Sequence, residues 1–399
     1  MVYEQAEKNY GENDKRLTAT TSDLVLYAES VDGIHWEKPE LGLYTFNDSF
    51  RNNIVYDFHS PSILFDTSES LESTRYKMIG FGSQGKQRGY CIALSGDGLN
   101  WRNASDKPVI NGGDTVTLMK NPLTGEYYAY HKQSHVVRGF SRRTVWLSKS
   151  RDFIHWTEPA LVLAPDDQDD TWASGPDQRT EFYNMTVHFS NGLFLGFVSV
   201  FRVSAVRNNV QPHQSRVDGP VYTEMVYSYD GITWRRFPGR VPVIPNGPPQ
   251  WDAGCILGVS NPLITDDEVW MYYTGINTTH GGAIPSKRCV IGRAAWRRDG
   301  FVSLNSGIEG LVETTPLQAT GSTLTVNADA SGGELSVDLL DHTGQVISGY
   351  GHEHCIPVST DNICHKIQWN SHGTIPPNRP IRLRFYCKNV KLFSFALDS

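Results

Sequence analysis

The sequence predicts an all-β protein, with a five-bladed β-propeller over residues 1–305 followed by a β-sandwich over residues 312–399. Three observations lead to this prediction. A Ser-x-Asp-Gly-x-x-Trp motif recurs along the first part of the chain, short alternating strands precede each copy, and the motif does not recur after residue 305. Units of several short strands that repeat every ~55 to 80 residues are typical of propellers. No long segment with a 3.6-residue period competes as a helix.

The repeated motif marks one turn in each predicted blade. Four copies begin at Ser30, Ser95, Ser150 and Ser228, and a degenerate fifth copy ends in the letters RDGF. Gly supplies the positive φ of a tight turn and Asp bonds to nearby backbone, so each copy predicts a hairpin closed by a packed Trp. An alternating strand precedes each copy, in residues 23–30, 89–95, 143–150, 223–229 and 289–296.

Further strand candidates complete the two predicted parts. Within the propeller they lie upstream of the motif, at residues 75–82, 126–132, 192–201 and 268–275, and another apolar strand comes before each of them. After residue 311, short alternating strands separated by turn residues occupy 324–331, 333–341, 365–370 and 380–397. A β-sandwich of about 85 residues is large enough to bury its own core.

Charge and composition argue against two classes of partner. The 36 Lys and Arg residues against 43 Asp and Glu give a net charge of −7 with no basic run, whereas nucleic-acid binding relies on clustered basic residues. No apolar stretch approaches the roughly 20 residues that cross a bilayer, so no membrane partner is expected. The first residues have neither the basic nor the apolar region of a secretory signal, yet both a cytoplasmic and a secreted location stay open. The oligomeric state also stays open.

The six cysteines are too sparse for a disulfide scaffold. Cys355 and Cys364 flank a polar loop and could pair in an oxidising compartment, or they could be two free thiols. No short-range spacing of metal ligands is present, so no metal and no cofactor are predicted.

An acidic residue lies at or near the start of four predicted inner strands. In a propeller the first strand of each blade lines the central channel, so these side chains converge although they are far apart in the sequence. The four acids are Asp57, Asp114, Glu181 and Asp252. Glu181 lies in an aromatic strand, where an unpaired carboxylate is costly unless it lines a wet cavity, and partial desolvation suits a general acid. The alternative is that Glu181 pairs with Arg179 or another Arg as a bridge between blades.

These features resemble a known group of enzymes. The repeated motif, the acids on successive inner strands and the trailing sandwich resemble the five-bladed glycoside hydrolases of families 32 and 68, with families 43 and 62 as more distant relatives. Residues 180–197, 251–281 and 291–307 resemble a group of poorly characterised family-32-like proteins. The Arg-Asp-Pro motif of the family would fall on His59-Ser60-Pro61, so Ser60 replaces its Asp. The nucleophile strand of the first blade has no counterpart, and residues 1–4 resemble the second strand of that blade.

The resemblance implies hydrolysis of a glycosidic bond by inner-strand carboxylates. We expect Glu181 to protonate the leaving oxygen and Asp114 or Asp252 to act as base or nucleophile, on a furanoside or a plant or microbial glycan. The separation of the two carboxyl groups decides between retention and inversion. Aromatic faces stack on sugar rings and polar groups bond to hydroxyls, so the candidates for binding an oligosaccharide or glycoside are Asp57, His59, His131, Arg179, Tyr183, Trp251 and His280. Trp251 could instead be blade packing, and His280 a surface residue.

Two other functions are compatible with the sequence. One is a catalytically inactive carbohydrate-binding propeller protein, which the missing first-blade strand supports. The other is a sialidase-like enzyme, whose Asp-box repeats a similar pattern. That box separates its Asp from its Gly, whereas Asp32 and Gly33 are adjacent here, and no Arg triad for a sialic-acid carboxylate is evident.

Overall fold

The computed structural model of the chain describes residues 2–5, 23–211, 214–284, 286–376 and 379–398. Over these residues the protein consists of strands with two single-turn 3-10 helices, η1 (Glu72–Thr74) and η2 (Asp167–Asp170), so the predicted all-β fold is confirmed. The described part of the chain contains no helix with the length and apolar character that a membrane span requires. The chain divides into two compact units, Met1–Asn261 with Tyr272–Arg293 and Pro262–Met271 with Ala294–Ser399. The boundaries at 1–305 and 312–399 stay a prediction.

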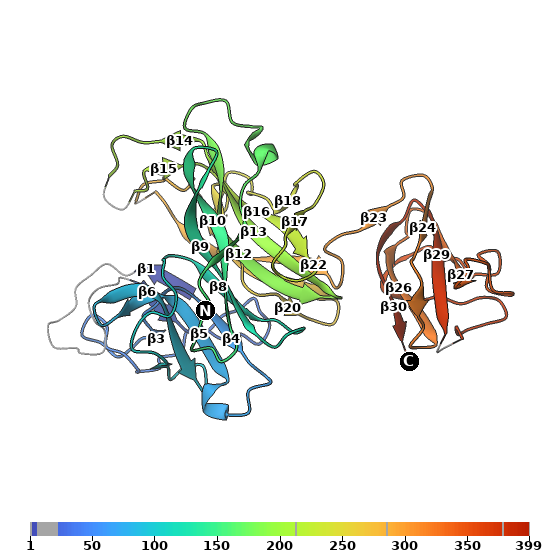
Figure 1. Ribbon diagram of the computed structural model, residues 1–399, viewed down its shortest axis with the longest axis horizontal. Coiled ribbons are helices and arrows are strands. Elements are labelled where there is room, and N and C mark those ends of the chain that lie inside the picture. The colour runs from blue at the N-terminus through green and yellow to red at the C-terminus, as the bar shows by residue number, and fades with distance from the viewer. Residues whose placement is uncertain (1, 6–22, 212–213, 285, 377–378, 399) are drawn as a thin grey trace. The chain divides into compact units, whose positions relative to one another are not determined.

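Three small antiparallel sheets and one nine-stranded sheet follow one another along this part of the chain (Figure 1). A single parallel pair divides the nine-stranded sheet into two parts, which are called the fourth and fifth sheets below. The first sheet contains β1 (Val2–Gln5), β2 (Asp23–Leu26) and β3 (Ile54–Tyr56). The second contains β4 (His59–Phe65), β5 (Tyr76–Gln84), β6 (Gln87–Ser95) and β7 (Arg102–Asn103). The third contains β8 (Val116–Lys120), β9 (Tyr127–Val137), β10 (Phe140–Ser150) and β11 (Ala160–Leu163).

The fourth and fifth sheets are joined by a single parallel pair, Val221 with Cys255. The fourth sheet contains β12 (Arg179–Ser190), β13 (Leu193–Val203), β16 (Val221–Ser228), β17 (Arg235–Arg236) and β18 (Pro242–Ile244). The fifth contains β19 (Cys255–Leu257), β20 (Leu263–Ile264), β21 (Glu268–Ile276) and β22 (Cys289–Arg297). The division between the two units runs through β21 and β22. A separate two-stranded ribbon, β14 (Ala205–Val206) with β15 (Val217–Asp218), projects from the fourth sheet.

The first strands of consecutive sheets lie beside one another, as a propeller requires. Between β4 and β8, the Ser62 hydroxyl accepts a hydrogen bond from the Leu118 amide at 2.9 Å. Just before β8, the Thr115 hydroxyl donates to the Tyr183 carbonyl of β12 at 3.0 Å. These bonds satisfy inner-strand backbone groups across the gap between sheets. Side chains that begin these strands are therefore brought to one region of the first unit.

The repeated motif forms the predicted turn. In the second copy the Asp97 carboxylate accepts from the Leu99 and Asn100 amides at 2.9 and 2.8 Å, and the Trp101 indole donates to the Gly98 carbonyl at 2.9 Å. The turn needs a positive φ, which is +70° to +76° at the three Gly positions. In the third copy Phe153 takes φ +68°, where a side chain is strained, and its ring is buried. Burial of the ring offsets the strain.

We expect Ser228→Ala to destabilise the protein by about 1–3 kcal/mol, because it removes the acceptor of a buried amide. The buried Ser228 hydroxyl accepts from the Gly231 amide at 2.9 Å and donates to Asp230 at 2.8 Å. Urea unfolding followed by tryptophan fluorescence measures the change. The matched control is Ser30→Ala in the first copy, where water can replace the lost bond and the loss should be smaller. Equal losses at the two positions would contradict this account.

The second unit contains two four-stranded sheets that share one core. One sheet consists of β23 (Leu304–Asn305), β30 (Lys391–Asp398), β26 (Thr323–Asp329) and β28 (Asp361–Lys366). The other consists of β24 (Gly310–Glu313), β29 (Pro380–Lys388), β25 (Leu317–Gln318) and β27 (Glu334–Asp341). Val326 from the first sheet and Phe385 from the second belong to the same buried cluster, with Trp369 beside them. Cys355 and Cys364 are free thiols, which is the second of the two sequence alternatives.

Candidate active site

A cavity of about 550 Å³ lies where the first three sheets meet in the first unit. Its polar and aromatic lining comes from β2, β4, β5, β6, the segment before β8, and β9. These lining residues are Asp23, His59, Phe81, Arg88, Asp114 and Lys132. The cavity therefore contains two residues that the sequence singled out, Asp114 and His59, and four that it did not.

A chain of charged groups crosses the cavity. His59 Nδ1 lies 2.8 Å from Asp23 Oδ2, and its Nε2 lies 3.0 Å from Asp114 Oδ1. The Lys132 ammonium donates to the other oxygen of Asp114. Because both ring nitrogens of His59 face carboxylates, the protonated ring satisfies both bonds at once. The two acids and two bases thus form one continuous hydrogen-bonded row.

The ionisation of these groups follows from the same contacts. Hydrogen bonds to Asp114 and then to Asp23 raise the pKa of His59 to about 9, against the opposing effect of burial. Burial raises the pKa of Asp114, but the His59 bond and the Lys132 charge outweigh it and hold that pKa at about 2. Burial lowers the pKa of Lys132, and the Asp114 charge offsets part of that effect. At neutral pH Asp114 is a carboxylate beside two cations.

We expect the thermal midpoint of the protein to fall as pH rises from about 7 to 9.5. The pKa of His59 is about 9 in the folded protein, above its ordinary value near 6.5, so its stabilising contribution is complete below pH 6.5 and is lost as pH rises through about 9. Thermal unfolding measured across this pH range, for the wild type and for His59→Gln, checks the effect. The variant should lose this part of the pH dependence. Parallel curves for the two proteins would show that His59 is not the group responsible.

The backbone departs from regular strand geometry at the two segments that carry His59 and Asp114. A register shift between His59 and Ser62 interrupts the pairing of β4 with β5, and Ser60 takes φ +44°. Asp114 takes φ +117°, two residues after Gly112 at φ +122°. Strained positions of this kind cluster at functional sites, and bulges re-aim side chains there. Among the four predicted acids, Asp114 is the one with a positive φ.

Tyr183 and His280 form a second group next to this row. The Lys132 ammonium lies 4.7 Å from the centre of the Tyr183 ring, and the Arg143 guanidinium lies 5.0 Å from it. Tyr183 is presented by a register shift in β12 between Phe182 and Met185. His280 Nε2 lies 3.4 Å from the Tyr183 hydroxyl, and burial lowers the pKa of His280 to about 4. A neutral His280 therefore accepts from Tyr183 at the edge of the charged row.

Glu181 is tied to two arginines. Its side chain is 1% exposed, with one oxygen 2.5 Å from Arg143 Nη1 and the other 2.8 Å from Arg179 Nε. Arg143 belongs to β10 of the third sheet and Glu181 to β12 of the fourth, so the contact bridges two sheets. This is the bridging arrangement that the sequence left as the alternative. Neither Glu181 nor Arg179 lines the cavity.

The other predicted residues lie outside the cavity lining. Asp252 accepts from the Tyr273 hydroxyl at 3.1 Å, and the Trp251 ring stacks on Tyr273 with centroids 5.8 Å apart. His131 is buried against Ser148, and burial lowers its pKa to about 4. Asp57 lies between β3 and β4, where burial raises its pKa. The structure joins Trp251 and Asp252 to the fifth sheet, and a role for these four residues in sugar binding or catalysis stays a prediction.

Sequence reasoning missed Asp23, Lys132 and Arg88. Asp23 begins the predicted strand that precedes the first motif copy, and that strand was not expected to line the channel. Lys132 is the last residue of the predicted aromatic strand at 126–132. A lysine at the end of a buried aromatic strand was a usable signal, since a buried ammonium needs a partner. Arg88 follows a hairpin turn, where exposed arginines are ordinary.

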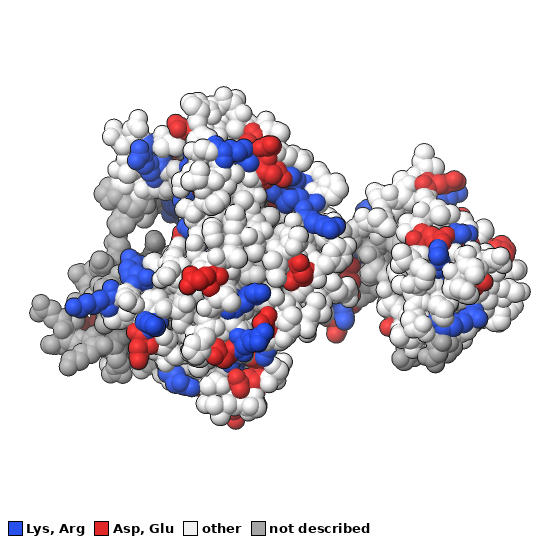
Figure 2. Space-filling view, viewed as in Figure 1, with Lys and Arg blue, Asp and Glu red and all other residues white. Residues whose placement is uncertain are grey.

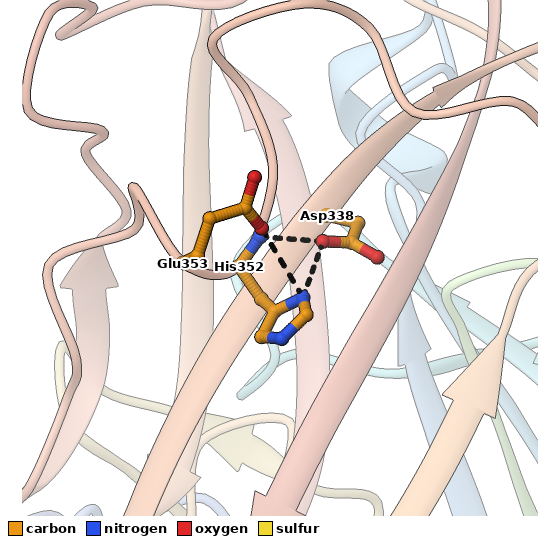
Figure 3. A group of neighbouring side chains, drawn as sticks. All are labelled: Asp338, His352 and Glu353. Carbon is orange, nitrogen blue, oxygen red and sulfur yellow. Dashed lines mark hydrogen bonds and ion pairs between the residues drawn. The ribbon is translucent and has the colours of Figure 1, made fainter.

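One group in the second unit has the residue types of a metal site. Figure 3 shows Asp338, His352 and Glu353 converging, and their ligand atoms lie within 4.8 Å of one another. Asp338 already accepts from the His352 amide and from the ring Nδ1, and its second oxygen accepts from the Tyr386 hydroxyl. Protein donors therefore satisfy both oxygens of the buried Asp338 carboxylate, and we do not propose a metal site here.

Comparison with known proteins shows that the chain is similar in backbone structure, at low sequence identity, to several solved structures. No family model matches the chain, and no curated protein matches it. Solved structures similar to it include a glycoside hydrolase at 14% identity, with 68% of this chain and 78% of that chain covered and a TM-score of 0.47. A thermostable family-43 glycoside hydrolase has 13% identity, 61% and 75% coverage and a TM-score of 0.42. Sucrose-6-phosphate hydrolase from Lactobacillus gasseri has 10% identity, 83% and 91% coverage and a TM-score of 0.33.

Proposed function

We propose that the chain is a glycoside hydrolase that uses Asp114 as base or nucleophile, on a furanoside or a plant or microbial glycan. The observation that carries the proposal is the state of Asp114. It is an ionised carboxylate, held by His59 and Lys132 on strained backbone, at the wall of a cavity large enough for a sugar. A carboxylate nucleophile must be ionised, accessible and held in place, and Asp114 meets these three requirements.

A second carboxylate is available in the same cavity. Asp23 and Asp114 bond to opposite nitrogens of His59, so their bonded oxygens lie no more than about 8 Å apart, a limit that admits both retaining and inverting geometries. Glu181, the acid expected from the sequence, does not line this cavity and is bonded to two arginines. The proton donor is therefore Asp23 or Glu181, and substitution of each distinguishes them.

The test is release of sugar from a panel of furanosides, pyranosides and plant and microbial oligosaccharides by the purified full chain. Reducing-sugar assays and thin-layer chromatography measure the product. Release by the wild type that is lost in Asp114→Asn supports the proposal. Ligand binding in calorimetry without release would instead favour the inactive carbohydrate-binding protein. Neither binding nor release across the panel would contradict both functions.

A further inference from the structure

Arg88 is a cation at the wall of the cavity. It is the second residue of β6, exposed, and its guanidinium lies 4.7 Å from the centre of the Phe81 ring. No carboxylate among the described residues lies within ion-pair distance of it. Stacking on an aromatic face holds the guanidinium plane while leaving its N–H groups free to donate. Arg88 is thus positioned to bind a group that enters the cavity.

Both carboxylates of the described cavity lining form ion pairs with cations other than Arg88. Asp114 is bonded to His59 and Lys132, and Asp23 is bonded to His59. With His59 protonated, the described lining holds three cations and two carboxylates, although the whole chain has a net charge of −7. Basic and acidic side chains are intermixed on the face shown in Figure 2, whereas the described lining of this cavity has a net positive charge. Such a cavity attracts an anion.

We propose that Arg88 and Phe81 form a subsite for the carboxylate of an acidic sugar, of the uronic acid class. This inference rests on the proposed function and names its substrate class. The guanidinium fork matches a planar carboxylate with two parallel hydrogen bonds, and Phe81 offers an apolar face to the sugar ring beside it. A neutral sugar gives Arg88 no partner of opposite charge. Sugar phosphates share the negative charge but not the planar two-oxygen geometry, and the experiment separates the two.

The experiment measures binding of four probes by calorimetry, using the full chain with Asp114→Asn so that no probe is consumed. The probes are the methyl glycosides of glucuronic acid and galacturonic acid, methyl glucoside, and glucose 6-phosphate. A uronoside should bind about tenfold or more tightly than methyl glucoside. Adding Arg88→Gln should remove this preference and leave the affinity for methyl glucoside unchanged, and Arg88→Lys should restore part of it. The matched control, Arg102→Gln on the exposed edge of the same sheet, should change nothing.

The outcomes separate this inference from the proposed function. Equal affinity for uronosides and methyl glucoside, or a uronoside preference that survives Arg88→Gln, would overturn the subsite. A preference for glucose 6-phosphate over both uronosides would overturn the carboxylate assignment. If the wild type hydrolyses neutral glycosides and shows no preference for uronosides, the function stands and the subsite fails. If uronosides bind through Arg88 but no glycoside is cleaved, the subsite stands and the proposed hydrolysis fails.

Discussion

Asp114→Asn should lower the rate of glycoside cleavage by about 10³-fold or more, because an amide can neither accept the proton nor attack the sugar. The substitution keeps the shape of the side chain, so it adds no steric demand at the positive φ of this position. The main structural cost is the loss of the negative charge that Lys132 and His59 face. We therefore expect a folded protein that still binds sugar. Steady-state kinetics on the best substrate of the panel, with calorimetry for binding, measures both.

Two controls make the result specific. Asp106→Asn changes an exposed acid of a neighbouring loop and should leave the rate unchanged. Asp23→Asn removes the other carboxylate that bonds His59, and a comparable loss there would identify Asp23 as the proton donor. If Asp114→Asn retains a rate within a few-fold of the wild type, Asp114 is neither base nor nucleophile, and the cavity is not the site of cleavage.

Glu181→Gln should destabilise the protein by about 3–5 kcal/mol, because it leaves the buried Arg179 and the partly buried Arg143 without their shared counterion. If Glu181 acted only as the general acid expected from the sequence, Glu181→Gln would abolish cleavage and leave the thermal midpoint nearly unchanged. Because of the two guanidinium contacts, we expect a loss of stability instead. Removing one partner of a buried ion pair costs more free energy than the intact pair contributes. Urea unfolding monitored by circular dichroism gives the free energy of unfolding.

The control for this prediction is Glu40→Gln, which breaks an exposed pair with Arg51 and should have little effect. A second variant, Arg143→Gln added to Glu181→Gln, should recover part of the lost stability because one uncompensated cation is removed. If Glu181→Gln instead unfolds like the wild type and loses cleavage, Glu181 is the proton donor and the bridging account is wrong.

The repeat could be predicted from sequence because its interactions are local. In each copy Ser, Asp and Gly are bonded within four residues, as at Ser95, Asp97 and Gly98, so the letters themselves specify the turn. The expectation that inner strands meet also follows from the repeat, and two of the residues that it singled out, Asp114 and His59, are in hydrogen-bond contact.

The rest of the site depends on contacts that the repeat does not determine. Asp23 bonds to His59 on the next sheet, Lys132 bonds to Asp114 just before the neighbouring strand of its own sheet, and the sequence spacing of these residues contains no sign of either contact. For Glu181 the sequence stated both outcomes, but the choice depends on Arg143, which lies 38 positions earlier and reaches Glu181 from another sheet. Burial and pairing between sheets are tertiary properties, and a single sequence without its fold leaves them open.

Phe81 touches both halves of the proposed site. An added Cβ at Gly113, the neighbour of Asp114, would lie 2.5 Å from the Phe81 ring, and the same ring supports the Arg88 guanidinium. One side chain therefore contacts both the backbone beside the proposed reactive carboxylate and the guanidinium proposed to bind the ligand. A substitution of Phe81 should therefore change both the preference for one sugar over another and the rate of cleavage, because the two proposed groups share this one contact.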